Sequence, residues 1–128
     1  MDLLDTHIFS VIGADGFERL VAAFYKQVPG DEILGPMYPS DDLVGAQTRL
    51  REFLIQRFGG PDTYSQNRGH PRLRMRHAPF AVDQRGRDRW MTLMRAALVE
   101  MAFPAQVNLV LLQFFEDSAT VMIHRATS

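Results

Sequence analysis

Apolar residues recur every three or four positions through four long stretches, and proline or glycine bounds them. The stretches run from Gly16 to Val28, from Asp42 to Phe58, from Asp83 to Met101 and from Pro104 onward. This spacing is that of one face of an α-helix, whereas a half-buried strand alternates apolar and polar residues. We find no convincing strand and no internal repeat. The sequence therefore predicts an all-α protein, and 128 residues suit one domain spanning residues 1–128.

Capping and stop signals set the expected limits of these helices. Asp15 is placed to cap the first helix, and Pro29-Gly30 to end it. Pro104 is expected to open the last helix. Its predicted buried stripe is Val107, Val110, Leu111, Phe114, Ser118, Val121 and Met122. The polar, turn-rich segment from Pro61 to Gly69 is expected to be a surface loop.

Composition narrows the function classes. Fourteen basic and 15 acidic residues give a formal net charge of -1, so we expect no nucleic-acid partner. The absence of cysteine excludes disulfides, thiolate metal sites and cysteine nucleophiles. No apolar stretch reaches the roughly 18 residues of a membrane span, so we expect no membrane partner. The acidic start, Met1 to Asp5, differs from a signal peptide and predicts a cytoplasmic protein.

One histidine stands at the end of a very short predicted helix within the stretch Gly69 to Phe80. Pro71 suits the first helical position, and Pro79 cannot continue the helix, so about two turns end at His77. Leu73 lies four residues earlier on the same face. Cations surround that face, at Arg72, Arg74 and Arg76. This surface suits a flat, hydrophobic ligand with anionic edges, although a basic surface loop is the alternative.

The residues point to an iron site with a single protein ligand. The four histidines, at positions 7, 70, 77 and 124, lack the spacing of a zinc site. In haem the macrocycle supplies four ligands, so His77 alone would suffice, with the Leu73 carbonyl in reach of its other ring nitrogen. Tyr25 and Trp90 lie on otherwise apolar inner faces, where their O–H and N–H groups need partners. A diatomic ligand on iron would be such a partner. The alternative is that both rings are ordinary core aromatics that hydrogen-bond to the backbone.

Motifs along the chain resemble those of a known family. In chain order they are Phe24-Tyr25, Met37-Tyr38-Pro39, Gly45-Ala46, Leu50-Arg51-Glu52-Phe53-Leu54, Phe58-Gly59-Gly60-Pro61, Thr63-Tyr64-Ser65, the stretch from Arg68 to Phe80, and Arg89-Trp90. Their order and spacing resemble the group II truncated haemoglobins, over a region from Phe17 to Ala97. The chain departs from that family where it carries Gly13-Ala14 in place of a paired glycine, and Phe58 where some members carry tryptophan.

The resemblance implies a truncated globin, a two-over-two helical sandwich around haem b, and it implies a role for each matching residue. His77 would be the proximal iron ligand. The distal ligand-binding residues would be Tyr25, Tyr38, Trp90, Ala46, Gln47 and Leu50. Further haem-binding residues would be Arg49, Phe53, Tyr64, Leu73, Arg76 and Phe80, with Arg49, Tyr64 and Arg76 near the propionates. Ala46 stands where many globins keep a distal histidine, and no residue is assigned a catalytic role.

Two functions follow from this resemblance. The first is reversible binding of dioxygen and other diatomic ligands, for storage, transport or sensing, with slow release because Tyr25, Tyr38 and Trp90 offer three donors. The second is a redox enzyme that detoxifies nitric oxide or reduces peroxide, served by an electron-donating reductase. A homodimer is left open. A third interpretation without haem is a helical domain that binds RNA through Arg68 to Arg76, and the near-zero net charge weighs against it.

Overall fold

The protein is built from helices in every part that the computed structural model describes, which is residues 5–38, 40–68 and 83–127. The elements are η1 (Asp5–His7), α1 (Ile8–Tyr25), η2 (Gly35–Met37), η3 (Ser40–Asp42), α2 (Leu43–Arg57), α3 (Thr63–Arg68), α5 (Gln84–Met101) and α6 (Ala105–Thr127). The predicted all-α class is therefore confirmed. The predicted histidine turn, Gly69 to Phe80, lies outside the described residues.

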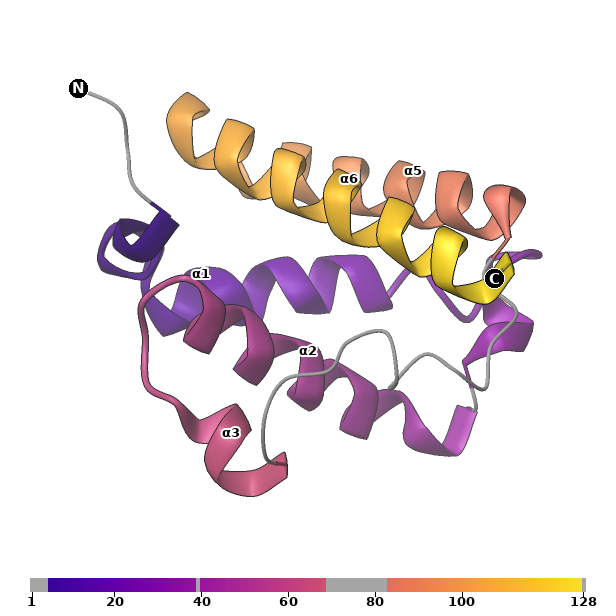
Figure 1. Ribbon diagram of the computed structural model, residues 1–128, viewed down its shortest axis with the longest axis horizontal. Coiled ribbons are helices and arrows are strands. Elements are labelled where there is room, and N and C mark those ends of the chain that lie inside the picture. Colours follow the sequence, from indigo (N-terminus) through magenta and orange to yellow (C-terminus); the bar gives the residue numbers. More distant parts are fainter. Residues whose placement is uncertain (1–4, 39, 69–82, 128) are drawn as a thin grey trace.

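The long helices form two layers. Figure 1 shows α5 and α6 side by side in one layer and α1 with α2 in the other, with α3 beyond α2. Helix α1 contacts both α2 and α5, so it joins the two layers. This arrangement is the predicted two-over-two sandwich. Within the described ranges, no helix is both long and apolar enough to cross a membrane.

Helix α1 differs from its prediction at both ends. It begins at Ile8, because a kinked segment precedes the predicted start, and Gly13 forms the kink with φ 67° and ψ 177°. It ends at Tyr25 and not at Val28, although Val28 is buried as predicted. Asp15 does not cap the helix start, because it lies within α1 and pairs with Arg19 four residues later, at 3.0 Å.

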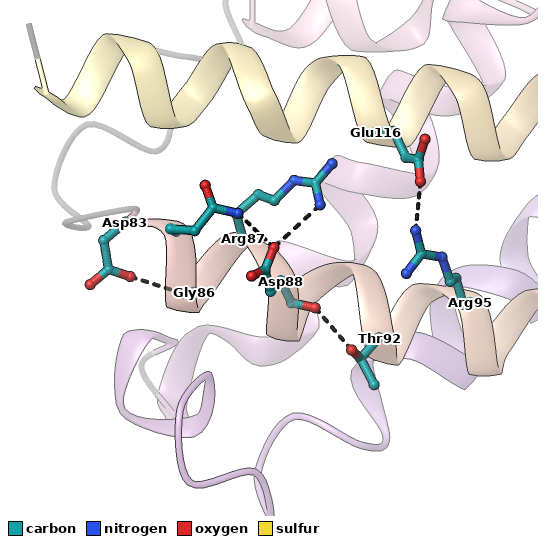
Figure 2. A network of polar contacts seen from close by, with 8 residues as sticks. Asp83, Gly86, Arg87, Asp88, Thr92, Arg95 and Glu116 are labelled. Atoms are coloured by element: carbon teal, nitrogen blue, oxygen red, sulfur yellow. Dashed lines mark hydrogen bonds and ion pairs between the residues drawn. The ribbon is translucent and has the colours of Figure 1, made fainter.

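Helices α2 and α5 match their predictions closely. The predicted limits of α2, Asp42 and Phe58, each lie one residue outside the observed helix. Helix α5 begins directly after Asp83, whose side chain accepts a hydrogen bond from the Gly86 N–H at 2.8 Å. Figure 2 shows this N-cap. The cap matters for function because it sets where the first turns of α5 lie.

Two predictions about the remaining helices are wrong. The segment expected to be a surface loop contains α3, which buries Tyr64. In α6 the buried positions are Val107 and Leu111, as predicted, followed by Phe115 and Ala119. Val110, Phe114 and Ser118, which were predicted to be buried, are only half-buried. The other two predicted positions, 121 and 122, have no described side chains.

A continuous series of aromatic rings runs through the core. Neighbouring centroids lie 6.0 Å apart for Phe17 and Phe58, 5.1 Å for Phe58 and Phe114, 5.7 Å for Phe114 and Phe115, 5.5 Å for Phe115 and Trp90, and 5.1 Å for Trp90 and Phe24. These contacts tie α1, α2, α5 and α6 together. Edge-to-face ring pairs favour fixed geometry beyond simple burial. The series therefore holds Trp90 at the inner faces of α1 and α5.

Candidate ligand-binding site

Three polar aromatic residues from separate segments meet at one end of α1. Tyr25 is the last residue of α1, Tyr38 directly follows η2, and Trp90 lies in the second turn of α5. The rings of Tyr25 and Tyr38 are perpendicular, with centroids 5.6 Å apart. Phe24 packs against both Tyr25 and Trp90, at 5.0 and 5.1 Å. Three of the six residues with predicted distal roles are therefore brought together.

The hydroxyl of Tyr38 is the centre of this group. It accepts a hydrogen bond from the indole N–H of Trp90, which can only donate, and another from the hydroxyl of Tyr25. Burial raises the pKa of Tyr25 well above its usual value, and the nearby Tyr38 raises it further. Burial also raises the pKa of Tyr38, against the opposing effect of the two hydrogen bonds that it accepts. Both phenols therefore keep their protons at neutral pH and remain donors.

Next to these tyrosines, α2 presents an apolar face that the protein only partly covers. Its residues are Leu43, Ala46, Leu50 and Phe53, and all four are half-buried. Only Leu54 is fully buried among the residues of α2. Gln47, next to Ala46, is half-buried too. A half-buried apolar stripe close to phenol and indole donors suits a flat apolar molecule with a small polar ligand on it.

An ion pair crosses the start of α2 near Tyr25. Arg49 donates to Asp42 at 2.6 Å, and the pair passes so close to Gly45 that a Cβ there would lie 2.4 Å from the Asp42 carboxylate. Both charges influence the Tyr25 phenol, with Arg49 lowering its pKa and Asp42 raising it. Arg49 therefore lies close enough to the Tyr25 phenol to act on it electrostatically.

A second ion pair holds the connector, which is the run of turns at residues 31–38 that leads from the end of α1 to Tyr38. Asp31 is almost fully buried, and its carboxylate accepts from the N–H groups of Ile33 and Leu34 and from Nε of Arg89. Burial alone would raise the pKa of Asp31, but these hydrogen bonds and the positive charge of Arg89 hold it below its usual value. Arg89 directly precedes Trp90, so this pair joins the connector to the α5 turn that carries the indole.

The other predicted site residues divide into two groups. Tyr64 is buried on α3, with its ring 5.5 Å from Phe53 in an edge-to-face contact. Predicted site residues outside the described ranges are His77, Leu73, Arg76 and Phe80. Their assignments stay predictions.

Sequence reasoning assigned no site role to Asp31, Arg89 or Asp42. A signal for Asp31 was present, because an aspartate just after Pro29-Gly30 is placed to accept from backbone N–H groups two and three residues later. The pairing with Arg89 joins positions 58 apart in the chain, and local sequence carries no sign of it. Asp42 was taken only as an acid near a helix start, although it pairs with Arg49.

A two-layer helical fold with phenol and indole donors at the edge of the core, beside a partly covered apolar helix face, is that of a globin. The family model of the bacterial-like globins matches residues 7–124. The chain belongs to this family and, within it, to the group II truncated haemoglobins. The sequence-based recognition is confirmed.

Three relatives show how closely the chain follows the family. It is 32% identical to the Group 2 truncated hemoglobin YjbI of Bacillus subtilis strain 168, over 91% of this chain and 88% of the relative. The thermostable hemoglobin of Thermobifida fusca is 46% identical, with a TM-score of 0.87 over 91% of this chain and 95% of that one. A structure described as a truncated oxygen-avid haemoglobin from Bacillus subtilis is 31% identical, with a TM-score of 0.85 over 91% and 98%.

Family membership makes the protein a haem globin, and globins as a family bind diatomic ligands such as oxygen. The described residues fit this group. The half-buried stripe of α2 offers an apolar surface, and Tyr25, Tyr38 and Trp90 offer neutral donors beside it. Such donors match the partial negative charge of bound dioxygen, and they do not compete as metal ligands while the phenols stay protonated.

Proposed function

We propose that the single domain of residues 1–128 binds haem b through His77 and holds dioxygen reversibly, with Tyr25, Tyr38 and Trp90 stabilising the ligand. The observation that supports this most is the convergence of these three side chains from α1, the connector and α5. Haem iron with one protein ligand supplies an open position for a diatomic molecule. The polar partners for that molecule come from this chain's own aromatic donors.

The side of the site next to α2 is proposed to stay apolar. Ala46 has no hydrogen-bonding side-chain atom, so the start of α2 offers space in place of a distal imidazole. Leu50 and Phe53 would contact the macrocycle, and Gln47 would border the ligand. Leu73 and Phe80 are proposed to do the same on the side of His77. The three aromatic donors, with Gln47 as the polar side chain that α2 adds, would then fix the orientation of the ligand.

The haem propionates are proposed to meet Arg49, Tyr64 and Arg76. Arginine suits carboxylate recognition because its guanidinium donates two parallel hydrogen bonds. Arg49 already pairs with Asp42, at the surface, where its side chain is 38% exposed. Exposed pairs of this kind are worth only about 1 kcal/mol or less, so a propionate could share or replace Asp42 at little cost.

A redox enzyme is the second candidate function, and the three donors favour it over bulk transport. Several hydrogen bonds to one ligand slow its release, whereas a transporter must release dioxygen readily. One solved relative is described as oxygen-avid, which agrees with strong ligand retention in this fold. In this second role the chain would turn over nitric oxide or peroxide, with an electron-donating reductase. Steady turnover by wild-type protein with a reductase, absent in His77→Gly, would select the enzyme.

The role of His77 is tested by removing its imidazole and supplying a free one. We expect His77→Gly to lose the visible spectrum of histidine-bound haem, and we expect added imidazole to restore it. His70→Gly is the matched control, because His70 is another histidine of the same stretch, and this variant should keep the wild-type spectrum. A wild-type spectrum in His77→Gly without imidazole would refute the assignment.

A further inference from the structure

We propose that the ion pair between Asp31 and Arg89 is a positioning device that sets the geometry of the Tyr38 and Trp90 donors, and through it the rate of ligand release. This inference rests on the proposed function, since it concerns the donors of that same site. Neither Asp31 nor Arg89 is proposed to touch the ligand. They act through the backbone segments that carry the two aromatic side chains.

Asp31 organises the connector from its buried end. One carboxylate oxygen accepts from the N–H of Ile33 at 3.0 Å and from that of Leu34 at 2.8 Å. The backbone carbonyl of Asp31 accepts from Gly35 at 2.9 Å. A carboxylate that accepts hydrogen bonds from several backbone N–H groups strongly favours one backbone conformation. The turn at residues 31–35 is therefore specified largely by the side chain and carbonyl of one residue.

This turn leads directly to Tyr38 through further backbone hydrogen bonds. The N–H of Met37 donates to the Leu34 carbonyl at 2.9 Å, and the N–H of Tyr38 donates to the Gly35 carbonyl at 3.3 Å. The residues that Asp31 orders thus provide the acceptors that hold Met37 and Tyr38. A change at the Asp31 carboxylate would reach Tyr38 through a short, continuous path of hydrogen bonds.

Arg89 completes the path on the other side. Its Nε donates to the second carboxylate oxygen of Asp31 at 2.5 Å, and it directly precedes Trp90 in α5. The indole of Trp90 donates to the Tyr38 hydroxyl. The connections therefore form a closed ring, from Asp31 through the connector to Tyr38, across to Trp90, and back through Arg89. Closing the ring restricts how far Tyr38 and Trp90 can shift relative to each other.

Burial makes this pair different from the exposed pairs of the protein. The Asp31 side chain is 2% exposed, whereas the acidic partners of the other described pairs are at least 35% exposed. Breaking a pair on one side leaves a buried charge without its partner, so the surrounding backbone must move or admit water. The connector is the segment able to respond, because it consists of turns rather than a long helix.

The test compares Arg89→Gln with Arg95→Gln. Arg95 is the matched control because it lies on the same helix and donates to Glu116, also at 2.5 Å, but its partner is on α6 and not on the segment that leads to Tyr38 (Figure 2). We expect Arg89→Gln to release dioxygen about three- to tenfold faster, as for one weakened hydrogen bond, and Arg95→Gln to match wild type. Arg89→Lys keeps the charge and should recover part of the slow release. Wild-type release from Arg89→Gln would overturn the proposal.

A haem-free measurement gives a second readout. Trp90 is the only tryptophan, so intrinsic fluorescence reports its surroundings alone. We expect the emission of the haem-free protein to shift to longer wavelength in Arg89→Gln and in Asp31→Asn, but not in Arg95→Gln. Unchanged emission in folded Arg89→Gln would contradict the inference. Because Arg89 is partly exposed, this variant stays informative even if Asp31→Asn fails to fold.

Combining variants separates positioning from general loosening of the fold. In a Tyr38→Phe/Trp90→Phe background the two donors that the ion pair is proposed to position are absent, although Tyr25 remains, so adding Arg89→Gln should change dioxygen release by less than about twofold. An undiminished effect of Arg89→Gln in that background would contradict a role through these donors.

If wild type takes up no haem, the proposed function fails while the fluorescence experiment still tests the pair. If wild type binds dioxygen and Arg89→Gln behaves like it, only this inference fails.

Discussion

Trp90 is the residue where core packing and ligand binding meet. Its ring belongs to the aromatic series between Phe24 and Phe115, and its N–H reaches the Tyr38 hydroxyl. In Trp90→Phe the ring packing is largely kept, and the N–H, which would have to turn from Tyr38 to the ligand in order to stabilise it, is lost. A hydrogen bond to a partly charged group is worth about 1.5 to 3 kcal/mol, so dioxygen release should become about ten- to a hundredfold faster.

Stopped-flow measurement of dioxygen release checks this expectation. Release from Trp90→Phe at wild-type speed would exclude the proposed role of the indole. Tyr38→Phe should also accelerate release, because it removes both a donor and the acceptor that orients Trp90. If only Tyr38→Phe has an effect, the ligand depends on the phenol and Trp90 is limited to the core.

The two phenols lead to a prediction about alkaline pH. The pKa values of Tyr25 and Tyr38 are raised above the usual value near 10, so both stay protonated in the folded protein through neutral and mildly alkaline pH. Dioxygen release should therefore stay constant from pH 7 to about 9.5. Their stabilising contribution to folding is fully present below about pH 10 and is lost as pH rises through the folded values. A dioxygen release rate that increases sharply as the pH is raised from 7 to about 9 would contradict the prediction that both phenols stay protonated.

At the residue scale, sequence reasoning reached the donors but not their supports. The helical period placed Tyr25 and Trp90 on inner faces, and the structure confirms that both face the core. Tyr38 follows a constrained connector, and its meeting with the other two depends on the turn that Asp31 orders. The partner of Asp31 is Arg89, 58 positions away, and no local pattern predicts such a contact. Long-range charge pairs depend on the finished fold.

At the scale of elements, Gly59 explains how the start of the chain meets the end of α2. It has a φ of 101°, and a Cβ there would lie 2.0 Å from the Thr6 carbonyl oxygen. The N–H of Phe9 also donates to the Phe58 carbonyl at 3.0 Å. We expect Gly59→Ala to lower the free energy of unfolding by about 2 to 4 kcal/mol, through backbone strain and steric overlap.

Two other glycines are controls for this stability prediction, measured by chemical denaturation. Gly13 has a φ of 67° but open space around its Cβ position, so Gly13→Ala should cost only about 1 to 2 kcal/mol. Gly30 has open space and no positive φ, so Gly30→Ala should change stability by about 0.5 kcal/mol or less. Equal stabilities of the Gly59 and Gly30 variants would show that the chain start does not dock there.

Elements with a clear apolar period were predictable, and those without one were not. Helices α2 and α5 combine such a period with stop or cap signals, and their limits were predicted within one residue. Helix α3 is polar apart from Tyr64, so one buried ring gave no period to detect. In α6 the adjacent Phe114 and Phe115 are both apolar, and only packing against Trp90 decides that Phe115 is buried.

At the scale of the whole molecule, two layers of helices bring the donors and the start of α2 together near the end of α1. Helix α1 joins the layers, so its last residue, Tyr25, lies where α2, the connector and α5 approach one another. This architecture was predictable only through the resemblance to truncated haemoglobins. Periodicity alone defined helices and their inner faces, and it left their order in space open.

The central claim is that this chain binds haem, and titrating the purified protein with haemin tests it most directly. We predict a visible spectrum of histidine-bound haem, with uptake that saturates at equal moles of haemin and chain. The same preparation should bind carbon monoxide and dioxygen after reduction. A colourless protein that takes up no added haemin would contradict the account.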